Sequence, residues 1–499
     1  MIESYLINLL FFMIYCLNIK KVIHIFQLKD YSTLRYLKFF KWKFVANVLL
    51  CSSLILSLLF ADPIFRLCYV CAILFVDNFY FTFSIKSKKT PFVKTGKAKR
   101  LIGFSIFVLF ALSFIPFSFT LFPFVFVFVP VISNSINFID RKKNKQFIAM
   151  AQNKLKNNNT KIIAITGSNG KTSVKNILLQ FLETSFKTQA TPSSYNTPLG
   201  ISKFINNELK NDTEFLILEY GARHKNDIIE LCNLFGADYG LITSIAPQHL
   251  ETFKTIDNIV YAKSQLSTFL KNKLCVFNLD NDHCQQIYNE KFGLKVGISI
   301  SKKNNIYASN IKIKNGKTLF KLHVDQNTFN CETQLLGKHN ITNILLGLAI
   351  SLELGVSIDK LLETISSFKP VPHRLQLIKT HINILDDSYN CSIDSAKQAI
   401  WVLNQFKGKK MIVTPGIIEG GKRQHELNFE LGKLCSFADF CIVVGNTNKK
   451  AILDGLKSQN FNDKNIIFSK SLDEAKRYFT LLSNNDTLLL LNDLPDDYN

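Results

Sequence analysis

The sequence predicts an α/β protein whose two folded domains are preceded by an all-α transmembrane region. Three observations carry this prediction: long apolar stretches near the N-terminus, a strand followed by a glycine loop and a helix after residue 160, and apolar runs alternating with helical segments toward the C-terminus. We expect a transmembrane region of four to five helices at 1–145 and a linker at 146–160. A central P-loop mononucleotide-binding domain at 161–370 and a Rossmann-like α/β domain at 371–499 follow.

Length and charge exclude several protein classes. The chain has 499 residues, enough for about three domains of roughly 150 residues, so a small disulfide-stapled scaffold is excluded. The net charge is +22, but much of the excess lies between apolar stretches, and no nucleic-acid module with interleaved aromatic residues is present. The 11 cysteines are an odd number scattered singly, which indicates a reducing, cytosolic compartment.

Four N-terminal stretches are apolar enough to enter a bilayer: residues 2–19, 44–62, 67–85 and 101–133. The last is too long for one crossing, and Pro116 with Ser118 offers a turn, so we interpret it as two short spans. One tilted, kinked span is the alternative, which leaves four or five spans in all. The first stretch lacks the basic start and small-residue cleavage site of a secretory signal.

Basic residues set the expected orientation of these spans. They fill two loops and follow the last stretch: Lys20, Lys21, Lys29, Arg35, Lys38, Lys41 and Lys43; Lys86, Lys88, Lys89, Lys94, Lys97, Lys99 and Arg100; and Arg141, Lys142, Lys143 and Lys145. Loops rich in lysine and arginine stay cytoplasmic. We therefore expect a multi-pass protein of the inner (cytoplasmic) membrane, in contact with membrane lipid, with both folded domains in the cytoplasm. Asp77 in the third stretch is interpreted as lying near a span end or facing another helix, rather than as a transport site.

The central domain begins with a phosphate-binding arrangement. Residues 161–166 form a short β-rich run, followed by Gly167, Ser168, Asn169, Gly170, Lys171, Thr172 and Ser173 and then by a helical pattern. Backbone N–H groups of such a loop approach phosphates, Lys171 can reach the β/γ-phosphates, and the Thr172 hydroxyl can hold Mg²⁺. Only two residues separate the glycines, unlike the general Walker A spacing, and a chance glycine turn before a helix is the alternative.

Two further strands are expected to end beside this loop. Residues 215–219 end in Glu219, and residues 239–243 lead toward His249. Ligands in parallel sheets bind at the carboxyl ends of the strands. A carboxylate and a neutral imidazole there can complete a Mg²⁺ sphere, so we favour the metal role, although His249 alone would fit a structural or surface histidine.

These residues resemble the Mur ligases, the ATP-dependent amide-forming enzymes of bacterial cell-wall precursor synthesis. The matching segments are ITGSNGKTS (165–173), LEYGA (218–222), TSIAPQHLETF (243–253), YAKSQL (261–266), FNLDND (277–282), GKHNITN (337–343) and HRLQ (373–376). SYNTPLG (194–200) and LDDSYNCSIDS (385–395) resemble the branch that adds D-alanyl-D-alanine to UDP-N-acetylmuramoyl-tripeptide. The resemblance spans most of residues 160–499.

The resemblance implies roles for individual residues. The glycine loop with Lys171, Thr172 and Ser173 would bind ATP and Mg²⁺, and Lys263 would be carbamylated by CO₂ to bind a second Mg²⁺; without the family it would be interpreted as a solvated helix charge. The other implied positions are Glu219 and His249 for metal, Asn278, His339 and Asn340 (with Asn343 nearby) for nucleotide, Arg374 for phosphates, Asp387, Ser388, Tyr389 and Asn390 near the dipeptide, and Asn196 and Thr197 at the sugar-nucleotide.

The chemistry implied is amide formation through an acyl phosphate. ATP phosphorylates a carboxylate, cations neutralise the phosphoryl charge, and the amino group of the dipeptide then displaces phosphate. No nucleophilic serine or cysteine is needed, and no triad is apparent. Two facing domains suit closure over the reactants, and Glu419 and His425 either line that cleft or lie on the surface.

The family resemblance leaves some features unassigned and some alternatives open. Residues 1–145 are interpreted as spans, so the domain that would bind uridine has no counterpart, and the last residues do not match the family ending. One alternative is a poly-glutamate or folyl-polyglutamate ligase; another is a membrane ATPase or transport regulator. We favour spans that anchor a ligase beside later membrane enzymes of wall synthesis, because few charges lie inside them.

Overall fold

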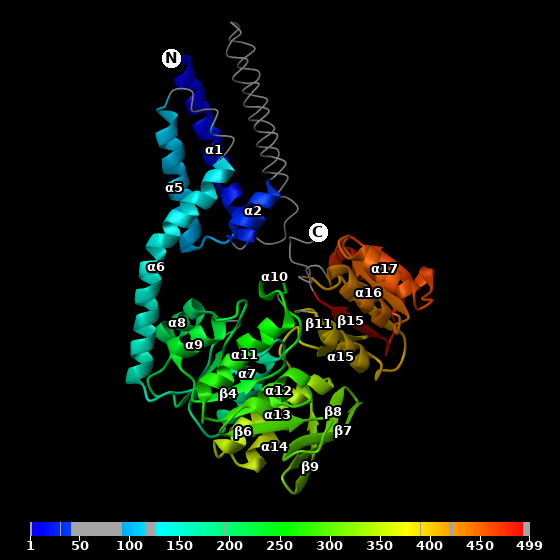
Figure 1. The fold of residues 1–499 in the computed structure, drawn as a ribbon. Coiled ribbons are helices and arrows are strands. Elements are labelled where there is room, and N and C mark those ends of the chain that lie inside the picture. Colours follow the sequence, from blue (N-terminus) through cyan, green and yellow to red (C-terminus); the bar gives the residue numbers. More distant parts are fainter. Residues whose placement is uncertain are drawn as a thin grey trace. The chain divides into compact units, whose positions relative to one another are not determined.

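A computed structural model describes residues 2–29, 31–40, 92–115, 121, 125–192, 195–248, 250–389, 391–418 and 423–492 (Figure 1). The chain divides into two compact units, Met1–Lys145 and Gln146–Asn499. The first unit is helical in its described part. The second contains two β-sheets with helices packed against them (Figure 1).

The first unit consists of α1 (Ile2–Leu28), α2 (Thr33–Phe39), α5 (Gly96–Ser113) and the first part of α6 (Val125–Asn157). Buried side chains of these helices, including Phe11, Tyr15 and Leu101, form one core. The Asn8 side chain donates hydrogen bonds to the carbonyls of Ser113 (3.3 Å) and Ile115 (2.7 Å). It therefore satisfies carbonyl groups at the C-terminal end of α5, which have no partner within the helix.

Within the described residues, one helix segment is long and apolar enough to cross a membrane, Asn8–Leu28 of α1. The first predicted span, 2–19, lies in α1, but the loop predicted from Lys20 was placed too early because the helix continues to Leu28. The predicted stretch 101–133 is divided between α5 and α6, while Pro116 and Ser118 lie outside the described residues. The stretches 44–62 and 67–85, with Asp77, also lie outside them.

The central sheet of the second unit has nine strands in the order β2-β3-β1-β4-β5-β6-β7-β8-β9. The strands are β1 (Lys161–Thr166), β2 (Thr188–Ala190), β3 (Phe215–Glu219), β4 (Tyr239–Ile242), β5 (Cys275–Asn278), β6 (Lys295–Ser299), β7 (Ile306–Lys314), β8 (Lys317–Val324) and β9 (Asn327–Thr333). Strands from β2 to β7 pair in parallel, and β7, β8 and β9 pair antiparallel. The three predicted strands are confirmed as β1, β3 and β4.

Helices cover this sheet on both faces, since two separate hydrophobic cores contain alternate residues of β1. The helices are α7 (Lys171–Leu182), α8 (Pro198–Asn207), α9 (Asp227–Phe235), α10 (Leu250–Phe253), α11 (Ile256–Leu270), α12 (Asp282–Glu290), α13 (Lys338–Glu353) and α14 (Ile358–Ser367). All five residues of β3 are buried, as expected of a parallel strand covered on both faces. The β1–β3 and β1–β4 registers place Thr166, Glu219 and Ile242 at one sheet edge.

The C-terminal sheet has six strands in the order β10-β11-β15-β12-β13-β14, and only the β10–β11 pair is antiparallel. Its elements are β10 (Gln376–Lys379), β11 (Asn383–Asp387), α15 (Ile393–Leu403), β12 (Lys410–Thr414), α16 (Gln424–Cys435), β13 (Phe440–Val444), α17 (Lys449–Lys457), β14 (Ile466–Ser469), α18 (Leu472–Ala475) and β15 (Thr487–Leu491). The apolar runs of this domain predict strands at 382–386, 411–415, 440–445, 465–469 and 487–491, and the structure confirms them as β11 to β15.

The segment predicted as a linker begins as a helix. Residues 146–157, in the segment predicted as a linker, belong to α6, and Ala151 is buried in one of the central cores.

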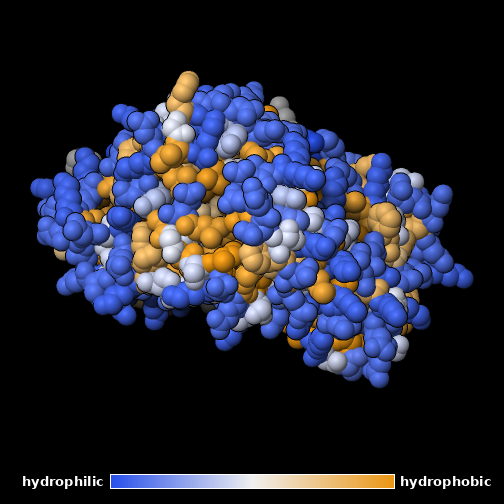
Figure 2. Space-filling view, turned by 90° about the horizontal axis from the view of Figure 1, so that it is seen from below, coloured by the Kyte–Doolittle hydropathy of each residue, from blue (hydrophilic) through white to orange (hydrophobic). Residues whose placement is uncertain are grey.

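Seen from below, most side chains are hydrophilic, and apolar ones gather near the middle of the view (Figure 2).

Candidate active site

The loop between β1 and α7 has a backbone that requires glycine at two positions. Gly167 has φ 151° and Gly170 has φ 85°. A Cβ on Gly167 would lie 1.9 Å from the Thr243 hydroxyl oxygen, and one on Gly170 would lie 2.8 Å from Asn343 Oδ1. Both glycines therefore let the loop approach the end of β4 and the start of α13 closely.

Gly167→Ala is expected to lower the free energy of unfolding by about 2–4 kcal/mol, because the added methyl group overlaps the Thr243 side chain. Gly236→Ala is the matched control, since Gly236 has φ 81° but open space around the added Cβ. Urea unfolding of both variants measures the difference. Equal losses in the two variants would show that the contact with Thr243 has no role.

Hydrogen bonds hold the middle of the loop against the segment that follows β4. The Ser168 hydroxyl donates to the Ala246 carbonyl (3.0 Å) and accepts from the Ala246 N–H (2.9 Å). The Gln248 side-chain amide donates to Asn169 Oδ1 (2.6 Å). These hydrogen bonds attach the middle of the loop to the segment 246–248.

Lys171 begins α7 and turns back over the loop. Its Nζ donates to the carbonyls of Gly167 (2.6 Å) and Ser168 (3.1 Å). Burial lowers the pKa of Lys171 to about 8; the Glu219 carboxylate opposes this shift and Arg374 adds to it. The structure thus places Lys171, Glu219 and Arg374 near one another, as the site prediction requires. Thr172 is half-buried in the first turn of α7.

Glu219 is the last residue of β3, and its side chain is 1% exposed. Its Oε1 lies 2.9 Å from Nζ of Lys175, a residue one turn after Lys171 in α7 that the sequence analysis missed. The Lys175 side chain is 2% exposed. Its only sequence signal is a cation placed among apolar residues of an amphipathic helix, which does not distinguish a buried lysine from a solvated one.

Lys263 lies in α11 and is buried, so the interpretation as a solvated helix charge is wrong. Burial lowers the pKa of Lys263 well below its ordinary value, and the neighbouring Lys171 ammonium lowers it further. A buried amine beside a second cation favours its neutral form or an added negative charge. The site therefore fits a lysine that becomes a carbamate.

The residues present fit a hard divalent cation only together with other oxygen donors. Among the described residues, no group of three His, Cys, Asp or Glu side chains is placed to hold a metal ion. Glu219 contributes a buried carboxylate and Thr172 a hydroxyl, and His249 lies outside the described residues. Phosphate and carbamate oxygens would complete such a donor set.

The residues predicted to contact the nucleotide lie around the ends of β5 and the start of α13. The Asn278 side-chain amide donates to the Thr243 carbonyl (3.0 Å), and the Asn340 amide donates to the Leu336 carbonyl (2.8 Å). Burial, and secondarily Arg374, lowers the pKa of His339 to about 4, so this imidazole is neutral at pH 7. Its Nδ1 is buried without a hydrogen-bond partner among the described residues.

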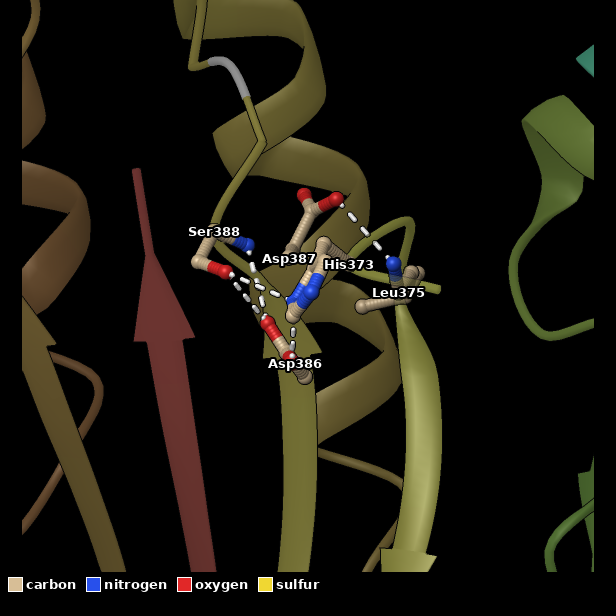
Figure 3. Close-up of polar contacts among 5 residues, drawn as sticks. All are labelled: His373, Leu375, Asp386, Asp387 and Ser388. Atoms are coloured by element: carbon tan, nitrogen blue, oxygen red, sulfur yellow. Dashed lines mark hydrogen bonds and ion pairs between the residues drawn. The ribbon is translucent and has the colours of Figure 1, made fainter. Parts of the chain in front are cut away.

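The HRLQ segment and the end of β11 meet in one cluster (Figure 3). His373 Nδ1 lies 2.8 Å from Asp386 Oδ2, and the Ser388 hydroxyl donates to Asp386 Oδ1 (2.6 Å). The Leu375 N–H donates to Asp387 Oδ1 (3.1 Å). Asp386 thus fixes His373 and Ser388, a structural role that the sequence analysis did not assign.

Two further predicted residues of this region, Arg374 and Tyr389, contact each other. The Arg374 guanidinium stacks on the Tyr389 ring at 4.1 Å from the ring centroid. Asn390 lies outside the described residues. Arg374 also lines a small pocket with Ser173 and Asn340, so residues of α7, α13 and the start of the C-terminal domain meet there.

Asp387→Asn is expected to change how stability depends on pH. Burial raises the pKa of Asp387 to about 7, while the Leu375 N–H and Arg374 oppose the shift. The Asp387 carboxyl has a pKa of about 3.9 in the unfolded chain, so the unfolded state loses its proton at a lower pH than the folded state. The free energy of unfolding therefore falls as the pH rises from about 4 to about 7. Asparagine does not titrate and removes this loss. The free energy of unfolding of the variant should therefore rise by about 1–3 kcal/mol relative to that of the wild type between pH 5 and pH 8. Urea unfolding at several pH values measures it, and a constant difference would contradict the assignment.

The remaining predicted residues take various positions. The Asn196 carbonyl accepts from the Gly221 N–H (3.2 Å), and the Thr197 hydroxyl caps α8 by accepting from the Gly200 N–H (3.3 Å). Asn196 therefore lies beside the segment that continues β3. His425 is exposed at the start of α16, and Glu419 lies outside the described residues.

Comparison with known proteins matches both folded domains to one family. The family model described as Mur ligase middle domain matches residues 165–351, and the one described as Mur ligase, glutamate ligase domain, matches residues 373–492. Relatives named UDP-N-acetylmuramoyl-tripeptide–D-alanyl-D-alanine ligase are similar to this chain. The relative from Buchnera aphidicola subsp. Baizongia pistaciae is 29% identical over 61% of this chain and 71% of its own length. The relative from Escherichia coli is 26% identical over 62% of this chain and 70% of its own length.

Two solved structures share the fold. The MurF ligase from Thermotoga maritima, in complex with ADP, superposes with a TM-score of 0.62 at 25% identity, covering 70% of this chain and 80% of that chain. The MurF structure from Acinetobacter baumannii gives a TM-score of 0.63 at 23% identity, with coverage of 70% and 78%.

Proposed function

The chain belongs to the Mur ligase family, and on this premise we propose that it is an ATP-dependent ligase that adds D-alanyl-D-alanine to UDP-N-acetylmuramoyl-tripeptide in peptidoglycan precursor synthesis. The observation that carries the proposal is the similarity to relatives named for this reaction, which extends over both folded domains. The geometry supports it, because the phosphate loop, Glu219 and Arg374 converge at the carboxyl ends of the central strands.

The reaction requires cations around a phosphoryl group and an exclusion of water. A carboxylate oxygen of the tripeptide attacks the γ-phosphorus of ATP, which releases ADP and leaves an acyl phosphate. The dipeptide amine then attacks the carbonyl carbon, loses a proton, and phosphate departs. Lys171, mostly protonated at pH 7, and Arg374 supply positive charge that stabilises the phosphoryl and oxyanion charge.

Mg²⁺, when bound, would neutralise phosphate charge and orient the phosphoryl group. Thr172 and Glu219 are the described residues that would hold it, and His249 is the further proposed ligand. We also propose that Lys263 reacts as a neutral amine with CO₂, forming a carbamate and releasing a proton. The carbamate charge would balance Lys171 and provide oxygen donors for a second ion.

We propose further that the first unit anchors the enzyme in the cytoplasmic membrane, next to membrane lipid and to later enzymes of wall synthesis. Several apolar side chains of α1 and α5 support this because they are exposed: Leu6, Leu9, Met13, Leu17, Phe104, Phe107 and Phe110. Such a set of exposed apolar side chains is unusual in a water-soluble protein. The Asn8 side-chain amide donates to carbonyls at the end of α5, which would have no water partner inside a membrane.

Membrane extraction tests the anchor. The wild type should stay in the membrane pellet after alkaline carbonate, and Met13→Arg should lower the pelleted fraction because a charge in a span costs about 3 kcal/mol. Met150→Arg is the control, since Met150 is about as exposed (60% against 54%) but lies on the part of α6 in the second unit. Release of the wild type by carbonate would contradict the anchor.

Product analysis tests the reaction. The detergent-solubilised full-length protein, with ATP, Mg²⁺ and UDP-N-acetylmuramoyl-tripeptide, should convert the tripeptide into a pentapeptide only when D-alanyl-D-alanine is added, as mass spectrometry would show. Glutamate in place of the dipeptide should give no product. Glutamate addition would instead favour the poly-glutamate type of ligase.

A further inference from the structure

Lys175 is a buried cation in the centre of the nucleotide-binding region. It lies in α7, and a lysine at 2% exposure is rare unless a charged partner accompanies it. The ion pair with Glu219 supplies that partner, and Glu219 is equally buried. Because both charges are shielded from water, each depends on the other far more than two exposed groups would.

Lys175 joins three elements where the strands β2 and β3 end. Its Nζ lies 2.9 Å from Glu219 Oε1 at the end of β3 and donates to the Thr191 carbonyl (2.6 Å) directly after β2. The strands β2 and β3 are paired neighbours, with Ala190 beside Ile217. One ammonium group on the phosphate-loop helix therefore holds the ends of two adjacent strands.

The segment beginning at Thr191 leads to the proposed sugar-nucleotide loop. The Asn196 carbonyl accepts from the Gly221 N–H, two residues after Glu219, and a Cβ on Gly221 would lie 2.9 Å from Asn196 Cγ. The loop is thus attached to β3 and its continuation at both ends, through Lys175 at Thr191 and through Gly221 at Asn196.

We propose that Lys175 is a positioning residue: it is the counter-ion of Glu219, it keeps that carboxylate beside the phosphate loop, and it links the nucleotide site to the loop for the sugar-nucleotide. The roles of Glu219 in metal binding and of the loop in substrate binding rest on the proposed function; the ion pair does not. A metal ion must share Glu219 with the Lys175 charge, so Lys175 weakens metal binding.

A double-mutant cycle tests the ion pair without using activity. In metal-free buffer, Lys175→Met should lower the Tm of the full-length protein by roughly 5 °C or more, because Glu219 stays buried after its ion-pair partner is removed. Adding Glu219→Gln should restore most of the loss. Lys187→Met is the matched control, because Lys187 pairs with Asp212 on the surface, and its Tm should stay within about 1 °C of the wild type.

The cycle decides the proposal even if Lys175→Met does not fold. A folded Lys175→Met/Glu219→Gln protein would then support the pairing, and an unfolded one would overturn it. Losses that simply add in the double variant would also overturn it.

Metal and substrate affinities test the positioning role. Mn²⁺ binding to the ADP complex, followed by electron paramagnetic resonance, should be about tenfold tighter in Lys175→Met than in the wild type. The KM for UDP-N-acetylmuramoyl-tripeptide should rise at least about fivefold while the KM for D-alanyl-D-alanine stays constant. Unchanged Mn²⁺ affinity and unchanged KM would overturn the role. If the double-mutant cycle shows coupling but the protein has no ligase activity, the proposed function is refuted and the ion-pair proposal stands.

Discussion

Lys171→Ala is expected to lower kcat/KM for ligation by roughly 10³-fold, because it removes the cation that the proposed mechanism places against the transferred phosphoryl group. Lys171 is suited to this task by its environment. Its Nζ is held by the carbonyls of Gly167 and Ser168, and its reduced pKa of about 8 still leaves it mostly charged at pH 7. A phosphate group in the loop would replace carbonyl dipoles with full negative charges, which strengthens the interaction.

Steady-state ligation and unfolding, measured on the same preparations, check this expectation. The Tm of Lys171→Ala should not fall by more than about 2 °C, because the substitution removes a partly desolvated cation that lies near Lys263. Lys161→Ala is the control, since Lys161 is exposed at the start of β1 and should keep full activity. Activity of Lys171→Ala within about tenfold of the wild type would refute the phosphate role of this loop.

Lys263→Ala is expected to lower kcat by roughly 10²- to 10³-fold while leaving the fold intact. In the proposed mechanism the neutral amine that burial and Lys171 favour would react with CO₂, and the carbamate would add negative charge beside Lys171. Lys397→Ala, which removes a helix lysine paired on the surface with Glu430, should have no effect on kcat.

The carbamate itself can be observed directly. Protein equilibrated with ¹³C-bicarbonate should show a carbamate carbon resonance that is absent from Lys263→Ala, and removal of CO₂ should lower the activity of the wild type. A wild-type spectrum without that resonance, together with full activity in CO₂-free buffer, would contradict the assignment of Lys263.

Local patterns predicted much of the second unit. The strand, glycine loop and helix at 161–182 follow from β-rich residues, glycines and helical periodicity in direct succession, and the C-terminal strands follow from apolar runs of uniform length. The antiparallel β7–β9 extension was not predicted. Buried and exposed positions alternate along much of β7 and β8, and Phe320 and Leu322 of β8 belong to one of the two central cores.

The site was only partly predictable for a physical reason. Glycines and strand ends indicate where a ligand binds, but burial of a charged residue arises from tertiary packing. No local pattern therefore distinguishes Lys175, and Lys263 was selected through the family resemblance. The stabilising role of Asp386 toward His373 and Ser388 likewise depends on contacts across the β10–β11 pair.

The most direct test of the account is the coupling between ATP turnover and amide formation. Phosphate release by the full-length protein in detergent should require UDP-N-acetylmuramoyl-tripeptide and D-alanyl-D-alanine together, and each phosphate released should match one pentapeptide formed. Phosphate release at the same rate without the dipeptide would contradict the ligase assignment and would favour a membrane ATPase.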